Sequence, residues 1–406
     1  MLKNSIKSNA CLGMFFALRC RFLFFNLGKK MKENAYCKKA ERHFASDFIE
    51  SLEPYSPISS RDKIVSGLAN CDLPPLKLDW NESTLPPSVA VKNAIINALA
   101  CNENLLNWYP ELSSKELRRK LAAYSGRAME EILVTNGSDD ALDLICKVFL
   151  DPKDEVVVPY PTYTHFLTYI HTRGAVVKKV ETPDPFKPDI ASVLENVTPA
   201  TKMIYIVNPN NPTGVLLSKQ QIATLCSIAS HCVVIVDEAY YEFAGETVLD
   251  LIDTYPNLIV TRTFSKAWAL AGLRVGYLLT NLSLIAQLSK VLNPKSVSVL
   301  AQIAATAALD DKQYMEKYVA DVKNSKLAML DFFRKRGITA FDSRANYIMV
   351  QHPHLPKLLE EMEHENIFVR DRSSFKMLPG FFRVTLGDHL QTEDFLSRMA
   401  KVLERV

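Results

Sequence analysis

The sequence of 406 residues has no stretch dominated by charge of one sign. Its 48 Lys and Arg residues are interspersed with 45 Asp and Glu residues, so the formal net charge is only +3. A surface that binds nucleic acid or another polyanion concentrates basic side chains, and no such stripe is present. The charge pattern therefore argues against nucleic acid as a partner and favours a small-molecule ligand.

The sequence also lacks the cysteine patterns of a metal site or a redox pair. Its eight cysteines include no CxxC pair and no Cys/His cluster at zinc spacing. We interpret them as reduced thiols of a cytoplasmic protein. The histidines of HPH, His352 and His354, lie in a predicted loop, where surface positions are more common than metal ligands. No metal is expected.

The N-terminal 30 residues lack an apolar run long enough to span a membrane, because Arg19 and Arg21 interrupt it. They also lack a clear small-residue cleavage site, so a secretory signal is the minority interpretation. Met31 offers a second possible start of translation. We therefore set residues 1–44 apart as an extension, with a start at Met31 as a hypothesis, and expect no membrane association.

What the sequence does contain is a series of short apolar runs that alternate with helical stretches. The runs are EVVVPY, AVVKKV, MIYIVNP, VVIVDEA, LIVTRT and VGYLLT. Such nearly continuous, β-branched runs are typical of strands that are covered on both faces. The alternation predicts an α/β fold whose central sheet is mostly parallel and flanked by helices.

The pattern changes after residue 295 to long helices, followed by ANYIMVQ, IFVRD and FFRVTL. These segments predict a smaller α+β domain. We therefore expect an N-terminal arm and part of the small domain in residues 45–107, a large domain in 108–295 and the small C-terminal domain in 296–406. A helix that begins in SSKELRRKL is expected to end at Gly126, a plausible C-terminal cap.

Lys266 in TRTFSKAWALAGLRVGY follows the predicted strand LIVTRT, so its amine lies at the carboxyl edge of the sheet, where α/β ligand sites are found. Apolar neighbours and the nearby Arg274 disfavour an ammonium group and lower the pKa of Lys266 toward that of a free amine. An isolated lysine is most often a surface residue. The functional interpretation therefore depends on the motifs around it.

The apolar strand in VVIVDEAYYEF delivers Asp237 to the same sheet edge, with Tyr240 three residues later. A carboxylate at this place can keep a pyridine nitrogen protonated, which makes pyridoxal phosphate an electron sink. By itself the motif fits a helix cap or a magnesium ligand equally well. A nucleotide site is disfavoured because no GxxxxGK[ST] loop is present.

Two further motifs suit an anionic or phenolic ligand. NPNNPTG follows a strand and contains Asn211, whose amide can contact a phenolic oxygen, although Asn, Pro and Gly also form ordinary turns. NGSDD stands where a helix begins, and free backbone N–H groups there bind phosphate. The candidate phosphate ligands are Gly137, Ser138, Asp139, Thr263, Ser265 and Arg274.

Taken together, the motifs resemble those of fold-type I pyridoxal-phosphate-dependent aminotransferases of class I/II. The resemblance is carried by SDDALDL after NG, PTY, NPNNPTG, VDEAYYEF, TFSKAWALAGLRVGY and FFRVTLG. The branch to which the chain is most similar is the histidinol-phosphate aminotransferase family. The motifs extend in family order from about residue 50 to the C-terminus.

The resemblance implies pyridoxal 5'-phosphate as the cofactor and a role for each motif. Lys266 bonds covalently to the cofactor and moves the proton at the substrate Cα, and Asp237 pairs with the pyridine nitrogen. Tyr240 and Asn211 hold the phenolic oxygen, and Tyr163 of PTY stacks on the ring.

The resemblance also implies a homodimer with shared active sites. Tyr109 of NWYPELSS matches the tyrosine that reaches the cofactor phosphate of the neighbouring subunit. Arg383 matches the arginine that binds the substrate carboxylate, where Asn211 also contributes. Arg370 matches a second arginine that holds a phosphate or distal acid, although a solvated strand-end charge is the simpler alternative for it.

The expected reaction moves an amino group from glutamate or another amino acid to a small phosphorylated carbonyl compound. One departure leaves an alternative open: this chain has NESTLPPS where the family carries NENPYGPS, with Leu85 in place of the tyrosine. Related decarboxylases of phosphoserine and phosphothreonine carry leucine there, so a decarboxylase is the alternative. A pseudoenzyme or the effector domain of a transcription regulator is disfavoured, because the catalytic motifs are complete.

Overall fold

The computed structural model describes residues 44–50, 52–53, 64, 73–187 and 189–406. The hypothesis of a translation start at Met31 lies outside the described residues. The chain divides into two units, Met1–Ser51 and Leu52–Val406. The first unit contributes the short helix α2 (Asp47–Glu50), which has no buried residue. The other described elements belong to the second unit.

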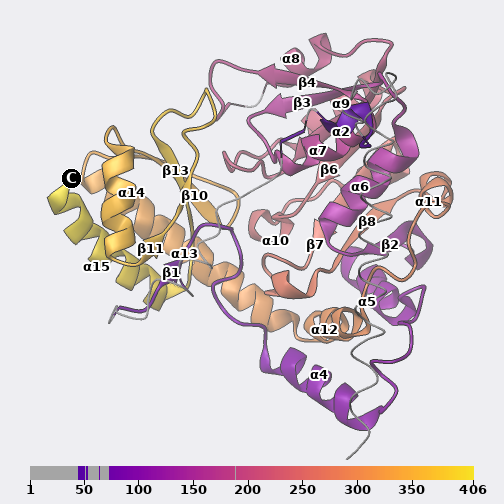
Figure 1. Ribbon diagram of the computed structural model, residues 1–406, viewed down its shortest axis with the longest axis horizontal. Helices are drawn as coiled ribbons and strands as arrows, with labels where there is room; N and C mark the ends of the chain where they lie inside the picture. The colour runs from indigo at the N-terminus through magenta and orange to yellow at the C-terminus, as the bar shows by residue number, and fades with distance from the viewer. Residues whose placement is uncertain (1–43, 51, 54–63, 65–72, 188) are drawn as a thin grey trace, which may run out of the picture. The chain divides into compact units, whose positions relative to one another are not determined.

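A seven-stranded sheet forms the centre of the second unit (Figure 1). Its order is β2-β8-β7-β6-β5-β3-β4, and only β8 runs antiparallel to its neighbours. The predicted mostly parallel sheet is therefore confirmed. The strands are β2 (Ile132–Thr135), β3 (Glu155–Tyr160), β4 (Val176–Glu181), β5 (Thr201–Val207), β6 (Val233–Asp237), β7 (Leu258–Thr263) and β8 (Gly276–Thr280).

Both faces of this sheet are buried, as continuous apolar strands require. In β6, Val234 and Val236 join one core cluster while Val233 and Ile235 join the other. The first cluster includes side chains from α5 (Lys115–Ser125), α8 (Ile190–Glu195), α9 (Lys219–Ile228), α10 (Tyr241–Ala244) and α12 (Val299–Asp310). The second includes side chains from α6 (Ser138–Phe149), α7 (His165–Thr172) and α11 (Leu282–Leu288).

The helix ends that matter for the site follow local sequence. Helix α5 ends at Gly126, which adopts φ 72° and donates its N–H to the Ala122 carbonyl, as the sequence predicts. Helix α6 begins directly after Gly137, whose φ of 83° belongs to the region that favours glycine. Short 3₁₀ helices occupy Met129–Glu131, Leu249–Asp253 and Ala271–Leu273.

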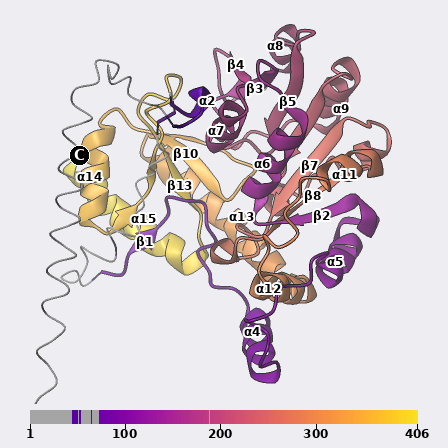
Figure 2. The same cartoon turned by 45° about the vertical axis from the view of Figure 1, so that its right-hand side comes forward.

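The C-terminal part contains a four-stranded antiparallel sheet of order β12-β13-β10-β9. Its strands are β9 (Thr339–Phe341), β10 (Tyr347–Gln351), β12 (Arg370–Asp371) and β13 (Phe381–Thr385). The helices of this part are α13 (Lys312–Lys335), α14 (Leu355–His364) and α15 (His389–Arg405). Helix α15 packs against both α13 and α14, and Figure 2 shows α14 and α15 next to each other. The predicted α+β character is confirmed, and the domain boundary at residue 295 stays a prediction.

The segment before residue 107 contributes to both parts. Strand β1 (Leu76–Lys77) pairs in parallel with β11 (Ile367–Phe368), and helix α4 (Val89–Cys101) packs against α12. Figures 1 and 2 both show α4 at the periphery, beside α12. Among the described helices, none is both long enough and apolar enough to cross a membrane.

Candidate active site

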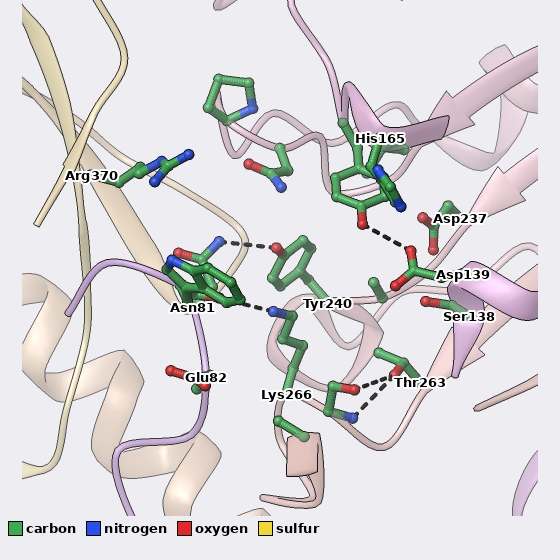
Figure 3. A pocket seen from close by; sticks show the side chains of 18 of the residues that line it. Asn81, Glu82, Ser138, Asp139, His165, Asp237, Tyr240, Thr263, Lys266 and Arg370 are labelled. Atoms are coloured by element: carbon green, nitrogen blue, oxygen red, sulfur yellow. Dashed lines mark hydrogen bonds between the residues drawn. The ribbon is translucent and has the colours of Figure 1, made fainter. Parts of the chain in front are cut away.

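A cavity of about 440 Å³ lies at the carboxyl ends of β5, β6 and β7. Parallel strands present their carboxyl ends at one edge, which explains why Lys266, Asp237 and Asn211 meet there. The segment Asp79–Glu82 and the strands β12 and β13 close the opposite side. In Figure 3, Lys266 and Tyr240 lie between Arg370 on one side and Asp139 on the other.

Lys266 follows β7 by three residues, and its amine reaches into the cavity. Its Nζ donates a hydrogen bond to the Trp80 carbonyl at 3.1 Å and lies 5.8 Å from the centre of the Tyr240 ring (Figure 3). Burial lowers the pKa of Lys266 to about 8, and the positive charges of Arg383 and Arg274 act in the same direction. Deprotonated lysine is the nucleophilic form, so the environment predisposes this amine to react with a carbonyl group.

Asp237 is the last residue of β6, and only 3% of its surface is exposed. Its carboxylate accepts hydrogen bonds from the Tyr205 hydroxyl at 3.0 Å and the Thr261 hydroxyl at 3.1 Å. Burial raises the pKa of Asp237 to about 6, although the two hydrogen bonds act in the opposite direction. A cation placed next to this carboxylate would stabilise its charged form, which is what a protonated pyridine nitrogen supplies.

Tyr240 is buried beneath the cavity and is oriented from the opposite side. Its hydroxyl accepts a hydrogen bond from Asn81 Nδ2 at 2.9 Å, and its ring contacts Tyr347 edge-on at 5.4 Å between centres. Asn81 is itself fixed, because Thr385 Oγ1 donates to its Oδ1 at 3.3 Å and Asn346 donates to its carbonyl at 3.2 Å. These contacts leave the Tyr240 hydroxyl in one position, with its proton free to be donated into the cavity.

The predicted phosphate ligands gather where α6 begins. Arg274 donates from Nη2 to Asp139 Oδ2 at 3.1 Å and from Nη1 to Ser265 Oγ at 3.3 Å. The Ser265 hydroxyl also accepts a hydrogen bond from Thr263 Oγ1 at 2.9 Å. Hydroxyls, a guanidinium group and a helix N-terminus that begins at Ser138 form a donor set typical of a phosphate site.

Gly137 is required by the closeness of Arg274 to the backbone. A Cβ at Gly137 would lie 2.6 Å from Arg274 Nη2. We therefore expect Gly137→Ala to displace the guanidinium group and to weaken cofactor binding by about ten- to a hundredfold, the range for losing a charged hydrogen bond. Spectrophotometric titration of the apoenzyme with the cofactor measures this loss.

Gly126→Ala is the matched control for this substitution. Gly126 has a similar φ of 72°, but a Cβ there would meet nothing within 4 Å. Gly126, with ψ 13°, lies in the left-handed region, where alanine costs about 1 to 2 kcal/mol. Gly137, with ψ 168°, lies in a region that almost only glycine adopts, so Gly137→Ala should cost more stability, and cofactor affinity is compared where both variants are folded. Equal cofactor affinity in the two variants would show that Gly137 serves only the backbone turn.

Two further predicted residues line the cavity with their polar groups engaged. The Tyr163 hydroxyl donates to Asp139 Oδ1 at 2.8 Å, which ties the aromatic wall to the start of α6. Asn211 accepts a hydrogen bond from Arg383 Nη1 at 2.6 Å through its Oδ1. Asn211, predicted to contact the phenolic oxygen, is thus hydrogen-bonded to Arg383, predicted to bind the substrate carboxylate.

Arg383 lies in β13 opposite Arg370 of β12, and both side chains line the cavity. Arg383 is 3% exposed and also donates from Nη2 to the Asp79 carbonyl at 2.7 Å, while its Nε has no hydrogen-bond partner. Burial holds the pKa of Arg383 below its usual value. Both predicted substrate arginines are thus positioned at the cavity.

Tyr109 is a predicted ligand that the structure places away from the cavity of its own chain. It is 76% exposed, lies under the Lys295 amine at 4.5 Å, and does not belong to the described lining of its own chain's cavity. Leu85 likewise does not line this cavity and packs against the main core cluster. In the described part of the chain, His352 and His354 belong to no cluster that could hold a metal ion.

Sequence reasoning missed several residues that the structure brings to the site. They are Asn81, which fixes Tyr240, Tyr205 and Thr261, which hold Asp237, and Arg372, which lines the cavity beside Arg370. The sequence could have indicated Arg372, because it lies two residues after Arg370 and residues two apart on a strand share a face. Tyr205 is a hydroxyl-bearing residue in an otherwise apolar run, and such a hydroxyl usually has a partner when buried.

The donor set fits the predicted cofactor, pyridoxal phosphate, at each of its polar groups. A lysine amine with a lowered pKa is available for the aldehyde, a buried acid for the pyridine nitrogen, a fixed phenol for the phenolic oxygen and a hydroxyl-guanidinium cluster for the phosphate. The cavity of about 440 Å³ leaves room for a substrate beside the cofactor.

Comparison with known proteins agrees with this chemistry. The family model described as aminotransferase class I and II matches residues 74–399. A dihydroxyacetone phosphate transaminase from Campylobacter jejuni is 39% identical over 353 residues, which cover 86% of this chain and 94% of the relative. A histidinol-phosphate aminotransferase from Methanocaldococcus jannaschii is 32% identical over 371 residues, covering 89% and 96%.

Solved structures share the fold. A histidinol-phosphate aminotransferase from Sinorhizobium meliloti in complex with pyridoxal-5'-phosphate superposes with a TM-score of 0.79 at 23% identity, covering 90% of this chain and 99% of that one. An aspartate aminotransferase from Thermus thermophilus with maleate gives a TM-score of 0.76 at 24% identity, covering 89% and 100%. The architecture is therefore that of the aspartate-aminotransferase fold.

Proposed function

The chain belongs to the aminotransferase class I and II family, and from this membership we propose that it transfers an amino group from glutamate to a small phosphorylated carbonyl compound. It is a pyridoxal-phosphate-dependent enzyme. When bound, this cofactor supplies an electron sink that allows the Cα–H bond of an amino acid to ionise.

Each of the site residues has a defined task in this reaction. Lys266 anchors the cofactor through its amine and, once released, moves the proton at the substrate Cα. Asp237 holds the proton of the pyridine nitrogen, and the Tyr240 hydroxyl, fixed by Asn81, donates to the phenolic oxygen. Ser265 and Arg274 bind the phosphate with the N-terminus of α6, and Tyr163 covers the ring.

The observation that carries the substrate class is the basic end of the cavity formed by β12 and β13. Arg383 suits the α-carboxylate of the amino donor, because its planar guanidinium group binds carboxylates through two parallel hydrogen bonds. The neighbouring Arg370 suits a second anionic group, the side-chain carboxylate of glutamate or the phosphate of the acceptor. The substrates in the names of both relatives, dihydroxyacetone phosphate and histidinol phosphate, carry a phosphate ester.

A pair of half-reactions tests the proposed function. We expect glutamate to convert the cofactor spectrum of the purified holoenzyme to that of the amine form in a single turnover. Dihydroxyacetone phosphate should then restore the original spectrum much faster than dihydroxyacetone, and histidinol phosphate is tested as an amino donor in parallel. A silent glutamate reaction, together with CO2 released from O-phosphoserine or O-phosphothreonine, would replace this proposal with the decarboxylase.

We further propose that the enzyme is a homodimer whose sites are shared. Large apolar side chains are exposed on α4 and the segment that follows it, and we expect a second copy to cover them. They are Val89, Ile96, Leu99, Leu106, Trp108 and Leu112. The exposed Tyr109 lies in the same segment, where it can reach a partner's cofactor phosphate. Light scattering should give twice the chain mass of 45.7 kDa, and a monomer with full activity would contradict the proposal.

A further inference from the structure

Three guanidinium groups share one face of the antiparallel pair β12–β13. Arg370 lies directly opposite Arg383, and the backbone N–H of Arg372 donates to the Phe381 carbonyl, which continues the ladder by one residue. Side chains two residues apart on a strand point to the same side, so Arg372 joins Arg370 and Arg383 there. All three line the cavity. Like charges placed together on one face of a sheet are destabilising unless something compensates them.

In the described part of the chain, the carboxylates of the cavity form their ion pairs and hydrogen bonds with residues other than Arg372. Asp79 and Glu82 form ion pairs with Lys77, Asp139 pairs with Arg274, and Asp237 accepts from Tyr205 and Thr261. Within the described ranges, no carboxylate forms an ion pair with Arg372 or Arg383.

Arg372 also has unused donors in a desolvated place. Its Nε is buried without a hydrogen-bond partner, and its guanidinium carbon lies 5.9 Å from the centre of the Phe375 ring, at the outer limit of a cation–π contact. Burial lowers the pKa of Arg372 well below its usual value, and the charges of Arg383 and Arg370 add to this effect. An anionic ligand would accept hydrogen bonds from the unpartnered donors of Arg372 and would stabilise its buried positive charge.

Building on the proposed function, we propose that Arg372 is a specificity-determining residue that binds the distal anionic group of each substrate. That group is the phosphate of the carbonyl acceptor and the side-chain carboxylate of the amino donor. Arg383 binds the α-carboxylate of the donor, which leaves Arg372, on the same face of β12–β13, to bind the distal group together with Arg370. A phosphate dianion suits this place best, because it offers enough oxygens to accept from more than one guanidinium group.

The test compares the holoenzymes of wild type, Arg372→Gln, Arg372→Lys and Lys376→Gln. Lys376 is an exposed cation in the same loop and does not line the cavity, so Lys376→Gln is the matched control for lost positive charge. The measured quantity is the ratio of kcat/KM for dihydroxyacetone phosphate to that for dihydroxyacetone. We expect Arg372→Gln to lower this ratio by about ten- to a hundredfold, the range for a hydrogen bond to a charged group. The control should leave it unchanged.

Arg372→Lys separates charge from geometry and should recover part of the ratio, because a lysine keeps the charge without the planar fork. The half-reaction with dihydroxyacetone, which carries no anionic group, should change far less in the two Arg372 variants than the half-reaction with dihydroxyacetone phosphate. A parallel loss with both acceptors in Arg372→Gln, or no loss with either, would overturn the role of Arg372.

The two proposals fail separately. If wild type accepts no phosphorylated carbonyl compound, the proposed function is wrong, and inorganic phosphate then serves as the probe for Arg372. The role of Arg372 is supported if phosphate inhibits the glutamate half-reaction of wild type and Arg372→Gln raises the inhibition constant about tenfold or more, by the same range. Equal inhibition of the two proteins, or no inhibition of wild type, overturns it.

Discussion

Replacing Lys266 with alanine will abolish amino transfer, with an expected loss of about 10⁴-fold or more. One side chain acting as a general acid and base contributes about 10²- to 10⁴-fold, and Lys266 also anchors the cofactor. The structure explains why this lysine is suited to both tasks. With a pKa lowered to about 8, half of the Lys266 side chains are free amines at pH 8. Anchoring should therefore become more favourable as the pH rises through about 8.

Borohydride reduction followed by mass spectrometry measures the anchoring directly. Wild type should retain the reduced cofactor on the peptide that contains Lys266, whereas Lys266→Ala should retain none. Lys290→Ala is a suitable control, because Lys290 is exposed and its amine donates a hydrogen bond to the neighbouring Gln287, away from the cavity. Cofactor that is still fixed to the Lys266→Ala protein would show that another lysine is the anchor.

The parts of the site that lie at the ends of parallel strands could be predicted from the sequence. An apolar run specifies where a strand ends, and parallel strands bring their carboxyl ends to one edge, so Lys266, Asp237 and Asn211 meet without any knowledge of the packing. The same reasoning does not reach Asn81. Its contact with Tyr240 spans 159 residues and depends on a segment that pairs through β1 with β11.

The antiparallel strand β8 illustrates the same limit. Its apolar run GYLLT has the composition of the parallel strands, but the connection from β7, residues 264–275, contains the 3₁₀ helix Ala271–Leu273 and no α-helix. A parallel neighbour requires a crossover connection that is usually an α-helix, so a connection without one favours the antiparallel direction. The character of the connection therefore carried information that strand composition did not.

Whether the Arg372 side chain faces the cavity also depends on how the strands β12 and β13 pair. Arg370 was recognised through its motif, whereas Arg372 gains a place in the cavity only because β12 pairs with β13 and turns alternate residues to one side. Tyr109 shows the opposite case. Its motif predicts a contact with a partner subunit. Tyr109 is exposed on the single chain, so this contact stays a prediction that the measurement of the dimer tests.

Arg383→Ala is the second substitution with a large expected effect, and it acts on substrate binding. Removing one partner of a buried, hydrogen-bonded charge pair costs about 2 to 5 kcal/mol, so kcat/KM for glutamate should fall by about 30- to 5,000-fold. Arg383 is 3% exposed, so little water is available to replace its guanidinium group around the carboxylate. Its hydrogen bonds to Asn211 and to the Asp79 carbonyl fix the direction in which it faces the substrate.

Two comparisons separate carboxylate binding from damage to the site. In Arg383→Ala, kcat/KM for glutamate should fall far more than kcat/KM for histidinol phosphate, an amino donor without a carboxylate. The reason is that only glutamate places a carboxylate at Arg383. Arg344→Ala is the control, since Arg344 pairs with Glu246 outside the cavity and should leave both donors unaffected. An unchanged KM for glutamate in Arg383→Ala would assign the α-carboxylate to another cation. Arg372 would then be the first candidate, because it lies on the same face of β12–β13 with donors still unused.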